Sequence, residues 1–459
     1  MLTSTVRSQD PAAQTSVRFL EELRADYRGP GFNVRLWDGT EWHTGHREQF
    51  TLLLKHPGAL RNMFLTPSEL TLGEAFIYDD FDVEGDLLAA FEFADYLLAR
   101  EYSVIARLKF GSLLARLPAN SGRQNGRSSA DLDGAVHSKK RDRQAVTYHY
   151  DVSNEFYSLW LDRALVYSCA YFKSEQDDLD AAQEQKLEYL CRKLRLRPGD
   201  RLLDLGCGWG GLLIHAARNY GVSAFGITLS VPQAELARQR IKAAGLEGRC
   251  KVEVCDYRDL EAVQEFDKLV SVGMFEHVGE ALLPEYFLRA GMLLRPGGIF
   301  LNHGIANSAT FQRKGPSFID KHVFPDGELV PLNVAVRAAE SARFEVRDVE
   351  SLREHYALTL RHWVRRLEAK AGQARSIVGD VTYRVWRLYM AGSAHAFTTG
   401  RLNLYQILLS KPDHGQSHLP LNRDDWYSRA EDSIGSLPPT ACAEVAVESK
   451  NATADDGAN

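Results

Sequence analysis

The sequence contains no long uninterrupted apolar segment. Its most apolar stretch, LLAAFEFADYLLA at 87–99, carries Glu92 and Asp95 in its middle, whereas a membrane-spanning helix needs about 20 predominantly apolar residues. The N-terminal residues MLTSTVRSQDPAAQTS lack the continuous apolar core of a secretory signal. We therefore expect neither a membrane span nor a secretory leader, and a cytoplasmic protein.

Cysteine and net positive charge are also scarce. Six cysteines occur among 459 residues, and no two of them form a CxxC pair, which argues against a disulfide framework and against a zinc site. The 55 Lys and Arg residues against 61 Asp and Glu give a formal net charge of −6, so no overall positive field attracts nucleic acid. We expect no metal and no nucleic-acid partner.

What the sequence does contain is enough apolar material, 44% of its residues, for two or three domains. The segment PANSGRQNGRSSADLDGAVHSKKRDR is polar and nearly free of aliphatic residues, so it is unable to bury enough surface to fold alone. The predicted organisation is a disordered N-terminus at 1–16, a small α+β domain at 17–117, a linker at 118–145, a larger α/β domain at 146–411 and a mostly disordered tail at 412–459.

Short apolar runs alternate with helical patterns in the larger domain, which is typical of βαβ units and a mainly parallel sheet. A helical pattern, GGLLIHAARNYG at 210–221, follows the first run. Another near 380–400 leads to the expected terminal strand LNLYQILL at 402–409. The other expected strands are RLLDLG at 201–206, VSAFGI at 222–227, KVEVCD at 251–256, KLVSVG at 268–273 and GIFLNH at 298–303.

The first of these strands runs directly into a glycine-rich turn, DLGCGWGG at 204–211. Glycine lets a backbone approach a ligand closely, and an open α/β sheet binds ligands at the carboxyl ends of its strands. An acid two residues before the first glycine suits a cationic amino group, as in S-adenosylmethionine, whereas a dinucleotide site would read GxGxxG. A turn that serves packing alone is the alternative. The candidate cofactor residues here are Asp204, Gly206, Cys207, Gly208, Trp209, Gly210 and Gly211.

The ends of the next two strands supply further candidates. Thr228, Leu229, Ser230 and Gln233 follow the second strand, where many nucleotide-binding domains recognise a ribose. Asp256, Tyr257 and Arg258 follow the third. Asp256 is a candidate acceptor for the adenine amino group, and a solvated loop carboxylate is an equally good interpretation.

Five motifs then occur in order: YHYDVSNEFYSLWLD with VYSCAYF, LLDLGCGWGGL, SVGMFEHVG, FIDKHVFPDGEL, and YMAGSAHAF followed by LYQILLS. With them the chain resembles, over about 70–411, the cyclopropane-fatty-acyl-phospholipid synthases and their mycolic-acid-modifying relatives. The resemblance implies a Rossmann-like class I methyltransferase domain of the α/β class, with a smaller N-terminal α+β lipid-contacting domain. It also implies S-adenosylmethionine as methyl donor, with Tyr167 and Ser168 against it.

The resemblance further implies methyl transfer to a cis double bond of a phospholipid acyl chain, followed by loss of a proton to bound bicarbonate and closure of a cyclopropane ring. The implied bicarbonate ligands are Cys169, Glu276, His303, Ile305 through its backbone, and Tyr389. Each has another interpretation: Glu276 as a surface carboxylate, His303 as a core histidine, and Tyr389 and Cys169 as packing residues.

Aromatic residues near these motifs could stabilise cations or line an acyl channel, or could be plain core residues: Tyr167, Tyr171, Phe172 and Phe275. Two positions depart from the family pattern. Ser393 replaces a common cysteine, and we expect it to be tolerated because the implied mechanism needs no thiolate. Asn302 replaces an aliphatic residue beside His303 and is a candidate determinant of the product.

The implied substrate lies in a phospholipid bilayer, so we expect a peripheral protein at the inner membrane face. Candidate contacts are the basic residues Lys139, Lys140, Arg141, Arg143, Arg361, Arg365 and Arg366. A homodimer is expected on the resemblance alone. The rival hypotheses are a methylene- or methyl-branched product from the same first step, a non-catalytic lipid-binding protein, and a methyltransferase for a small molecule.

Overall fold

The computed structural model describes residues 9–44, 47–119, 129–261, 264–310 and 317–427. Contacts between residues group Met1–Leu419 into one compact unit, and a second unit begins at Pro420. The described part of the second unit contains the short helix α16 (Asp424–Tyr427). Within the described ranges, no helix is both long and apolar enough to cross a membrane.

A small sheet flanked by helices forms the N-terminal part, as the expected α+β arrangement requires. Its strand order is β2-β1-β3-β4, with β1 and β3 parallel and the outer pairs antiparallel. The strands are β1 (Gly31–Arg35), β2 (Glu41–His43), β3 (Glu48–Leu54) and β4 (Phe81–Gly85). The helices are α1 (Pro11–Leu23), α2 (Ala59–Phe64), α3 (Glu69–Ile77), α4 (Leu87–Ala99) and α5 (Val104–Ala115).

Two features of this part differ from expectation. Helix α1 starts at Pro11, inside the predicted disordered segment, because Asp10 caps it and Phe19 is buried against Phe110 of α5. Residues 1–8 of that segment lie outside the described residues. Strand β4 occupies FDVEG, within residues 66–110, a part of the chain whose sequence predicts mostly helix, because it pairs with β3.

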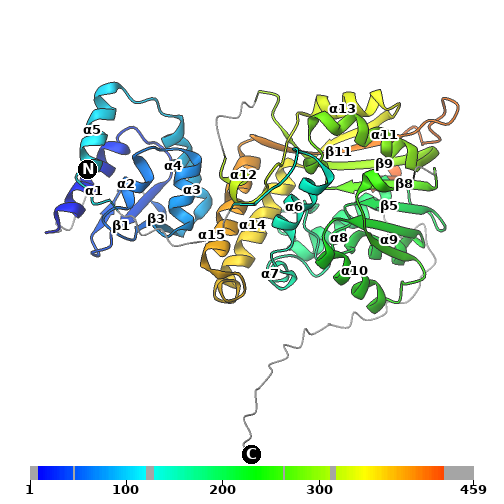
Figure 1. Cartoon of the computed structure of the whole chain (residues 1–459), viewed down its shortest axis with the longest axis horizontal. Coiled ribbons are helices and arrows are strands. Elements are labelled where there is room, and N and C mark those ends of the chain that lie inside the picture. Colours follow the sequence, from blue (N-terminus) through cyan, green and yellow to red (C-terminus); the bar gives the residue numbers. More distant parts are fainter. Residues whose placement is uncertain (1–8, 45–46, 120–128, 262–263, 311–316, 428–459) are drawn as a thin grey trace, which may run out of the picture. The chain divides into compact units, whose positions relative to one another are not determined.

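The larger part is built on a seven-stranded sheet of order β10-β11-β9-β8-β5-β6-β7 (Figure 1). Strands β7, β6, β5, β8 and β9 are parallel to one another, and β11 is antiparallel to both β9 and β10. The strands are β5 (Arg201–Leu205), β6 (Ser223–Thr228), β7 (Cys250–Val254), β8 (Phe266–Val272), β9 (Leu294–Asn307), β10 (Glu345–Ser351) and β11 (Leu402–Ser410).

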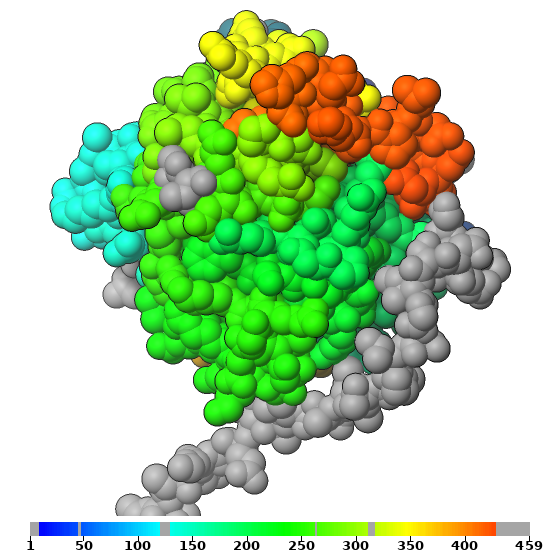
Figure 2. All heavy atoms as spheres, turned by 90° about the vertical axis from the view of Figure 1, so that its right-hand side faces the viewer, coloured from blue at the N-terminus to red at the C-terminus, as the bar shows by residue number. Residues whose placement is uncertain are grey.

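Helices cover both faces of this sheet. In Figure 1, α8 (Leu179–Lys193), α9 (Gly211–Tyr220) and α10 (Val231–Ala243) lie on one side, and α11 (Leu283–Leu293) and α13 (Leu332–Ser341) lie on the other. The elements from β5 to α11 form most of the face seen in Figure 2, where they are coloured green. The remaining short elements are α7 (Asn154–Ser158), α12 (Phe318–His322), η1 (Tyr257–Asp259), η2 (Phe275–His277) and η3 (Glu280–Leu282).

Helix α6 (Lys139–Tyr150) begins inside the predicted linker 118–145. Ser138 caps it, and its residues Asp142, Ala145 and Val146 are buried. The polar composition is therefore compatible with a helix that packs through one face, and the linker is shorter than we expected. Residues 120–128 of the predicted linker are outside the described ranges.

Two long helices, α14 (Arg353–Ala369) and α15 (Ala371–Thr398), join the N-terminal part to the larger one. The α15 side chain of Arg384 donates to the carbonyl of Phe76 at 2.8 Å and forms an ion pair with Asp82 at 2.9 Å. Arg387, one turn further along, also pairs with Asp82 at 2.9 Å. These contacts fix β4 and its flanking residues against the helix that carries Tyr389.

Candidate active site

The glycine-rich turn after β5 has a backbone conformation that side chains would not tolerate. Gly206 has φ +93°, and a Cβ there would lie 2.9 Å from the Cβ of Met274. A Cβ on Gly211 would lie 2.9 Å from the carbonyl oxygen of Ala164. Packing therefore accounts for these two glycines, whereas Gly208, at φ +53°, faces open space where a ligand could approach.

At the end of β5, Asp204 is buried, and its Oδ1 has no hydrogen-bond partner among the described residues. Burial raises the pKa of this carboxyl to about 7, although the charge of Lys186 opposes the rise. A buried, unsatisfied carboxylate is costly, and a cationic ligand would remove that cost. Asp204 is therefore suited to bind an amino group.

The residues after β6 and β7 form hydrogen bonds that fix their side chains. Thr228 donates to the amide oxygen of Gln233 at 2.8 Å. The Ser230 hydroxyl donates to Asp151 at 2.5 Å and accepts from the backbone N–H of Gln233. Because these contacts cap α10 and tie it to the end of α6, they position the polar groups of Thr228 and Gln233.

Asp256 is held by Arg258, which donates to its Oδ1 from Nε at 2.8 Å and to its Oδ2 at 2.6 Å. Burial alone would raise the pKa of Asp256, but the bonds and charge of Arg258 keep that pKa below its ordinary value. Arg258 also pairs with Asp142 of α6 at 2.8 Å. Asp256 is therefore an ionised, buried acceptor rather than a solvated loop carboxylate.

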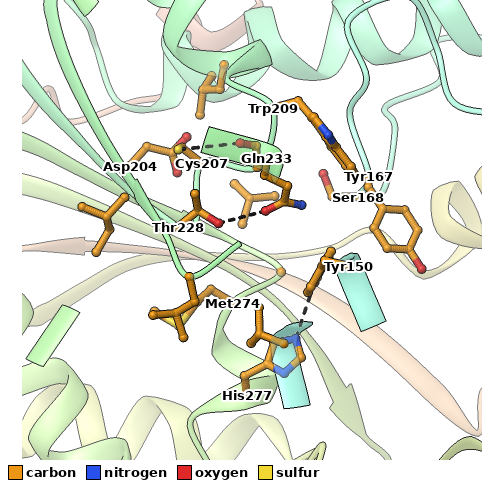
Figure 3. Close-up of a pocket in the computed structure, with 18 of the residues that line it drawn as sticks. Tyr150, Tyr167, Ser168, Asp204, Cys207, Trp209, Thr228, Gln233, Met274 and His277 are labelled. Atoms are coloured by element: carbon orange, nitrogen blue, oxygen red, sulfur yellow. Dashed lines mark hydrogen bonds between the residues drawn. The ribbon is translucent and has the colours of Figure 1, made fainter. Parts of the chain in front are cut away.

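These strand ends surround a cavity of about 150 Å³, which we call the cofactor cavity. Most of the predicted cofactor residues line it: Tyr167, Ser168, Asp204, Gly206, Cys207, Gly208, Trp209, Gly211, Thr228, Leu229, Gln233, Asp256, Tyr257 and Arg258. Gly210 and Ser230 do not line it: Gly210 precedes α9, and Ser230 caps α10. Figure 3 shows Thr228 and Gln233 turned toward each other, and Tyr150 turned toward His277.

Sequence reasoning missed Lys186, which lies on α8 and lines the cofactor cavity. Its ammonium donates to the hydroxyl of Ser168 at 2.9 Å, and its side chain is 1% exposed. Burial lowers its pKa to about 8. In EQKLEY a lysine is typical of a solvated helix face, so the sequence carried no signal for this residue.

A second, larger cavity of about 630 Å³ adjoins the first, and we call it the acyl cavity. Tyr150, Tyr167, Ser168, Gly273 and His277 line both cavities. All five predicted catalytic residues line the acyl cavity: Cys169, Glu276, His303, Ile305 and Tyr389. Many of its other walls are apolar side chains of the N-terminal part, among them Leu52, Phe76, Val83, Phe91, Phe93 and Leu97.

Two of the residues in this cavity present unpaired polar atoms. Glu276 accepts from the backbone N–H of Ile305 at 2.7 Å through Oε1, and its buried Oε2 has no partner among the described residues. Burial raises the pKa of Glu276 to about 7. The Nε2 of His303 is also buried and unpartnered in the described ranges, and burial keeps the pKa of His303 well below its ordinary value.

Two further predicted catalytic residues of this cavity, Cys169 and Tyr389, are held in their neutral forms. Burial raises the pKa of the Cys169 thiol, which donates to the carbonyl of Ala170 at 3.2 Å. Burial likewise raises the pKa of Tyr389, although hydrogen bonds with Tyr167 and Ser393 oppose the rise. Since no thiolate is favoured at this site, a serine at position 393 is compatible with its chemistry.

Several other candidates lie elsewhere. Tyr171 stacks on His355, Phe172 stacks on His362, and Phe275 packs against Tyr286, so these three line neither cavity. Asn302 accepts from the hydroxyl of Tyr286 at 2.9 Å and lines neither cavity, because alternate residues of β9 point to opposite faces. Among the predicted basic contacts, Lys139, Lys140, Arg141 and Arg366 are in ion pairs with Asp259, Asp133, Asp326 and Asp180.

Comparison with known proteins places this arrangement among related enzymes. A family model described as mycolic acid cyclopropane synthetase matches residues 137–407, and a model of a domain of unknown function matches 19–96. A probable fatty acid methyltransferase of Pseudomonas putida is 43% identical over 399 residues, which are 86% of this chain and 95% of the relative. The cyclopropane-fatty-acyl-phospholipid synthase of Escherichia coli K12 is 38% identical over 276 residues, 60% of this chain and 70% of the relative.

Among solved structures, a mycolic acid cyclopropane synthase complexed with SAH and CTAB aligns with a TM-score of 0.56 and 33% identity, covering 58% of this chain and 97% of its own. Together with the sheet order, this similarity confirms the expected fold class, a Rossmann-like class I methyltransferase domain preceded by a smaller N-terminal part.

Proposed function

The chain belongs to the mycolic acid cyclopropane synthetase family and is a methyltransferase of the cyclopropane synthase type, and we propose that it closes cyclopropane rings across cis double bonds of unsaturated phospholipid acyl chains. The observation that carries this proposal is the pair of adjoining cavities: a smaller one at the glycine-rich strand ends, lined by the carboxylates of Asp204 and Asp256, and a larger one with many apolar walls. Glu276 and His303 are buried and line the larger cavity, which shares Tyr167 and Ser168 with the smaller one.

S-adenosylmethionine fits the cofactor cavity. Asp204, buried and lacking a partner for one oxygen, suits the amino group of its methionine part, and Asp256 offers an ionised acceptor for the adenine amino group. Ser168, whose hydroxyl accepts from Lys186, is free to donate its own hydrogen to a carboxylate. When bound, this cofactor supplies an activated methyl group on a sulfonium, and the related structure with SAH, the demethylated product, supports the assignment.

The acyl cavity provides what an unactivated double bond requires. An isolated alkene is a weak nucleophile, so the enzyme must hold it in line with the methyl group at near-attack distance. The apolar walls contributed by the N-terminal part exclude water and favour a hydrocarbon chain. Tyr167, which lines both cavities, presents an aromatic ring where positive charge develops on the substrate.

A carbocation on the acyl chain must then lose a proton from the added carbon for the ring to close. The unpartnered Oε2 of Glu276 is an acceptor, and the unpartnered Nε2 of His303 can donate. Bicarbonate has one O–H donor and two acceptor oxygens, so it matches this pair, and when bound it supplies an oxygen that takes the proton. Tyr389 and Cys169 line the same cavity as neutral groups.

A second candidate function shares the same first step. After a hydride shift in the carbocation, loss of a proton from the added carbon would give a methylene branch, and loss from a neighbouring chain carbon would give a methyl-branched alkene. The relative named as a probable fatty acid methyltransferase, which matches over 95% of its length, favours this alternative. Asn302 is not the residue to decide between them, since it points away from the acyl cavity.

The proposed source of the substrate is a phospholipid bilayer, with the protein peripheral at the inner membrane face. In support, Val104, Ile105 and Leu108 on one face of α5 are 74%, 80% and 70% exposed. Leu98, at the end of α4, lines the acyl cavity and is itself 44% exposed. Apolar side chains at a cavity mouth suit contact with lipid, since large exposed apolar groups are unfavourable in water. A homodimer stays a prediction.

The test is mass spectrometry of acyl chains after incubation of the full chain with S-adenosylmethionine, bicarbonate and vesicles of cis-unsaturated phospholipid. Fragmentation locates the added carbon. A ring across the former double bond is expected, and a methylene or methyl branch would move the assignment to the second candidate. If no lipid gains a carbon although calorimetry shows that the cofactor binds, both candidate functions are wrong.

A further inference from the structure

A residue outside the five catalytic candidates contacts the imidazole ring of His303. Gln406 of β11 lies directly opposite His303 of β9 in the antiparallel register. The side-chain amide nitrogen of Gln406 lies 3.2 Å from the Nδ1 of His303, and both side chains are 1% exposed. Opposed residues on neighbouring strands share a face, so the pair lies together beside the acyl cavity.

With the amide nitrogen of Gln406 facing the ring, only one arrangement of protons makes this contact a hydrogen bond. An amide nitrogen donates and does not accept, so the Nδ1 of His303 must offer its lone pair. A neutral imidazole that is bare at Nδ1 carries its hydrogen at Nε2. His303 lines the acyl cavity, and its Nε2 is buried and has no partner within the described residues.

We infer that Gln406 is a positioning residue that holds His303 in the Nε2–H tautomer, so that His303 donates a hydrogen bond into the acyl cavity and does not take the substrate's proton. This inference rests on the proposed function, in which an anion in the cavity accepts that hydrogen bond. It assigns His303 to binding and orienting the proton acceptor, and it excludes His303 as the base. Orientation of a histidine through its second nitrogen is a common way to fix its role.

The first test is the tautomer itself, read by two-dimensional NMR of ¹⁵N-histidine-labelled full chain. The His303 signals are identified by their loss in His303→Gln. A bare nitrogen at Nδ1 and a protonated nitrogen at Nε2 are expected. A protonated Nδ1 would mean that Gln406 presents its oxygen to the ring, and would overturn the inference.

Two variants extend the test. Gln406→Glu places an acceptor opposite Nδ1, so the hydrogen should move to Nδ1 and leave Nε2 bare. Gln406→Leu removes the partner, so both tautomers should appear. The matched control is Asn403→Asp, an amide-to-carboxylate change on the same strand at a residue that lines neither cavity, and it should leave the His303 tautomer unchanged.

Turnover provides the second measurement. Gln406→Glu should lower turnover by about 10- to 100-fold, raise the KM for bicarbonate, and leave the KM for S-adenosylmethionine unchanged. Unchanged tautomer and turnover in both variants would overturn the inference even if cyclopropane is formed. Conversely, absence of any lipid product from the wild-type chain would refute the proposed function, and the NMR result would still decide the tautomer.

Discussion

At the scale of single residues, burial determines the chemistry of the site more than sequence motifs do. The motifs identify Glu276 and Asp204, but they say nothing of their pKa values, which burial raises to about 7 in both. Glu276 lines the acyl cavity and Asp204 lines the cofactor cavity, and each has one buried oxygen without a hydrogen-bond partner among the described residues. Each can therefore be tested by a measurement specific to its cavity.

We expect turnover to fall as the pH falls through about 7. Protonation of Glu276 removes the acceptor that the proposed anion needs, and because its pKa is raised from 4.5 to about 7, the loss occurs near neutrality. At pH 6 about nine tenths of the carboxyl is protonated, so turnover should be about tenfold below its plateau. The measurement is turnover at saturating S-adenosylmethionine and constant bicarbonate; a flat profile between pH 6 and 8 would contradict the role of Glu276.

Asp204→Asn should weaken binding of S-adenosylmethionine by about tenfold or more, because a charge-assisted hydrogen bond contributes about 1.5–3 kcal/mol. Calorimetric titration of the full chain with S-adenosylmethionine measures this affinity. Asp200→Asn, at a half-buried loop acid before β5 that lines neither cavity, is the control that should bind as the wild type does. Equal affinity in Asp204→Asn would remove this carboxylate from the cofactor site.

The sequence predicts part of the site at this scale. Glycine spacing and motif resemblance identify residues that line both cavities. They do not identify Lys186 or Gln406, because a lysine in a charged helical segment and a glutamine in a strand are both commonest on surfaces. Only the fold brings Lys186 to Ser168 and Gln406 to His303.

At the scale of elements, helix α15 links the two halves of the acyl cavity. Tyr389 and Ser393 line that cavity, and one or two turns earlier Arg384 and Arg387 contact Asp82 of β4. Helix propensity and apolar periodicity predict this helix near 380–400 from the sequence. They do not predict β4, whose five residues lie between two helices and pair with β3 only in the folded chain.

Arg384→Met should destabilise the protein by about 2 kcal/mol. The Arg384 side chain is 5% exposed, and its removal takes one ion-pair partner from Asp82, which is partly buried. The other two partners of Arg384, Asp79 and Asp380, are about half exposed. The cost therefore stays below the ~3–5 kcal/mol of a fully buried pair. Urea denaturation measures the change, and Arg375→Met, which removes an exposed pair with Asp380, is the control. If Arg384→Met loses no more stability than the control does, the proposed role of α15 in joining the two parts is contradicted.

At the scale of the whole molecule, the N-terminal part and the methyltransferase domain belong to one compact unit and line a common cavity. We expected two domains separated by a linker, and the structure groups Met1–Leu419 into one unit in which both parts line one cavity. Sequence does not reveal this, because the ion pairs that join them connect residues about 300 positions apart. The position of the exposed residues of α5 depends on the same fold.

A triple variant, Val104→Ser, Ile105→Ser and Leu108→Ser, should bind vesicles about tenfold more weakly, because apolar area no longer enters the interface. Co-sedimentation with vesicles of anionic unsaturated phospholipid measures this. The pair Leu288→Ser and Met292→Ser, at exposed apolar positions on α11, is the control. Equal binding by the triple variant and the wild type would refute contact through α5.

The central claim is that carbon passes from S-adenosylmethionine to an acyl double bond and then loses a proton in the cavity that holds Glu276. The most direct measurement uses S-adenosylmethionine with a trideuterated methyl group and mass spectrometry of the vesicle lipids. We predict acyl groups that gain one carbon and retain two of the three deuterium atoms, formed by the wild type and nearly absent with Glu276→Gln. Retention of all three deuterium atoms, transfer to a hydroxyl or amine, or equal product from Glu276→Gln would contradict the account.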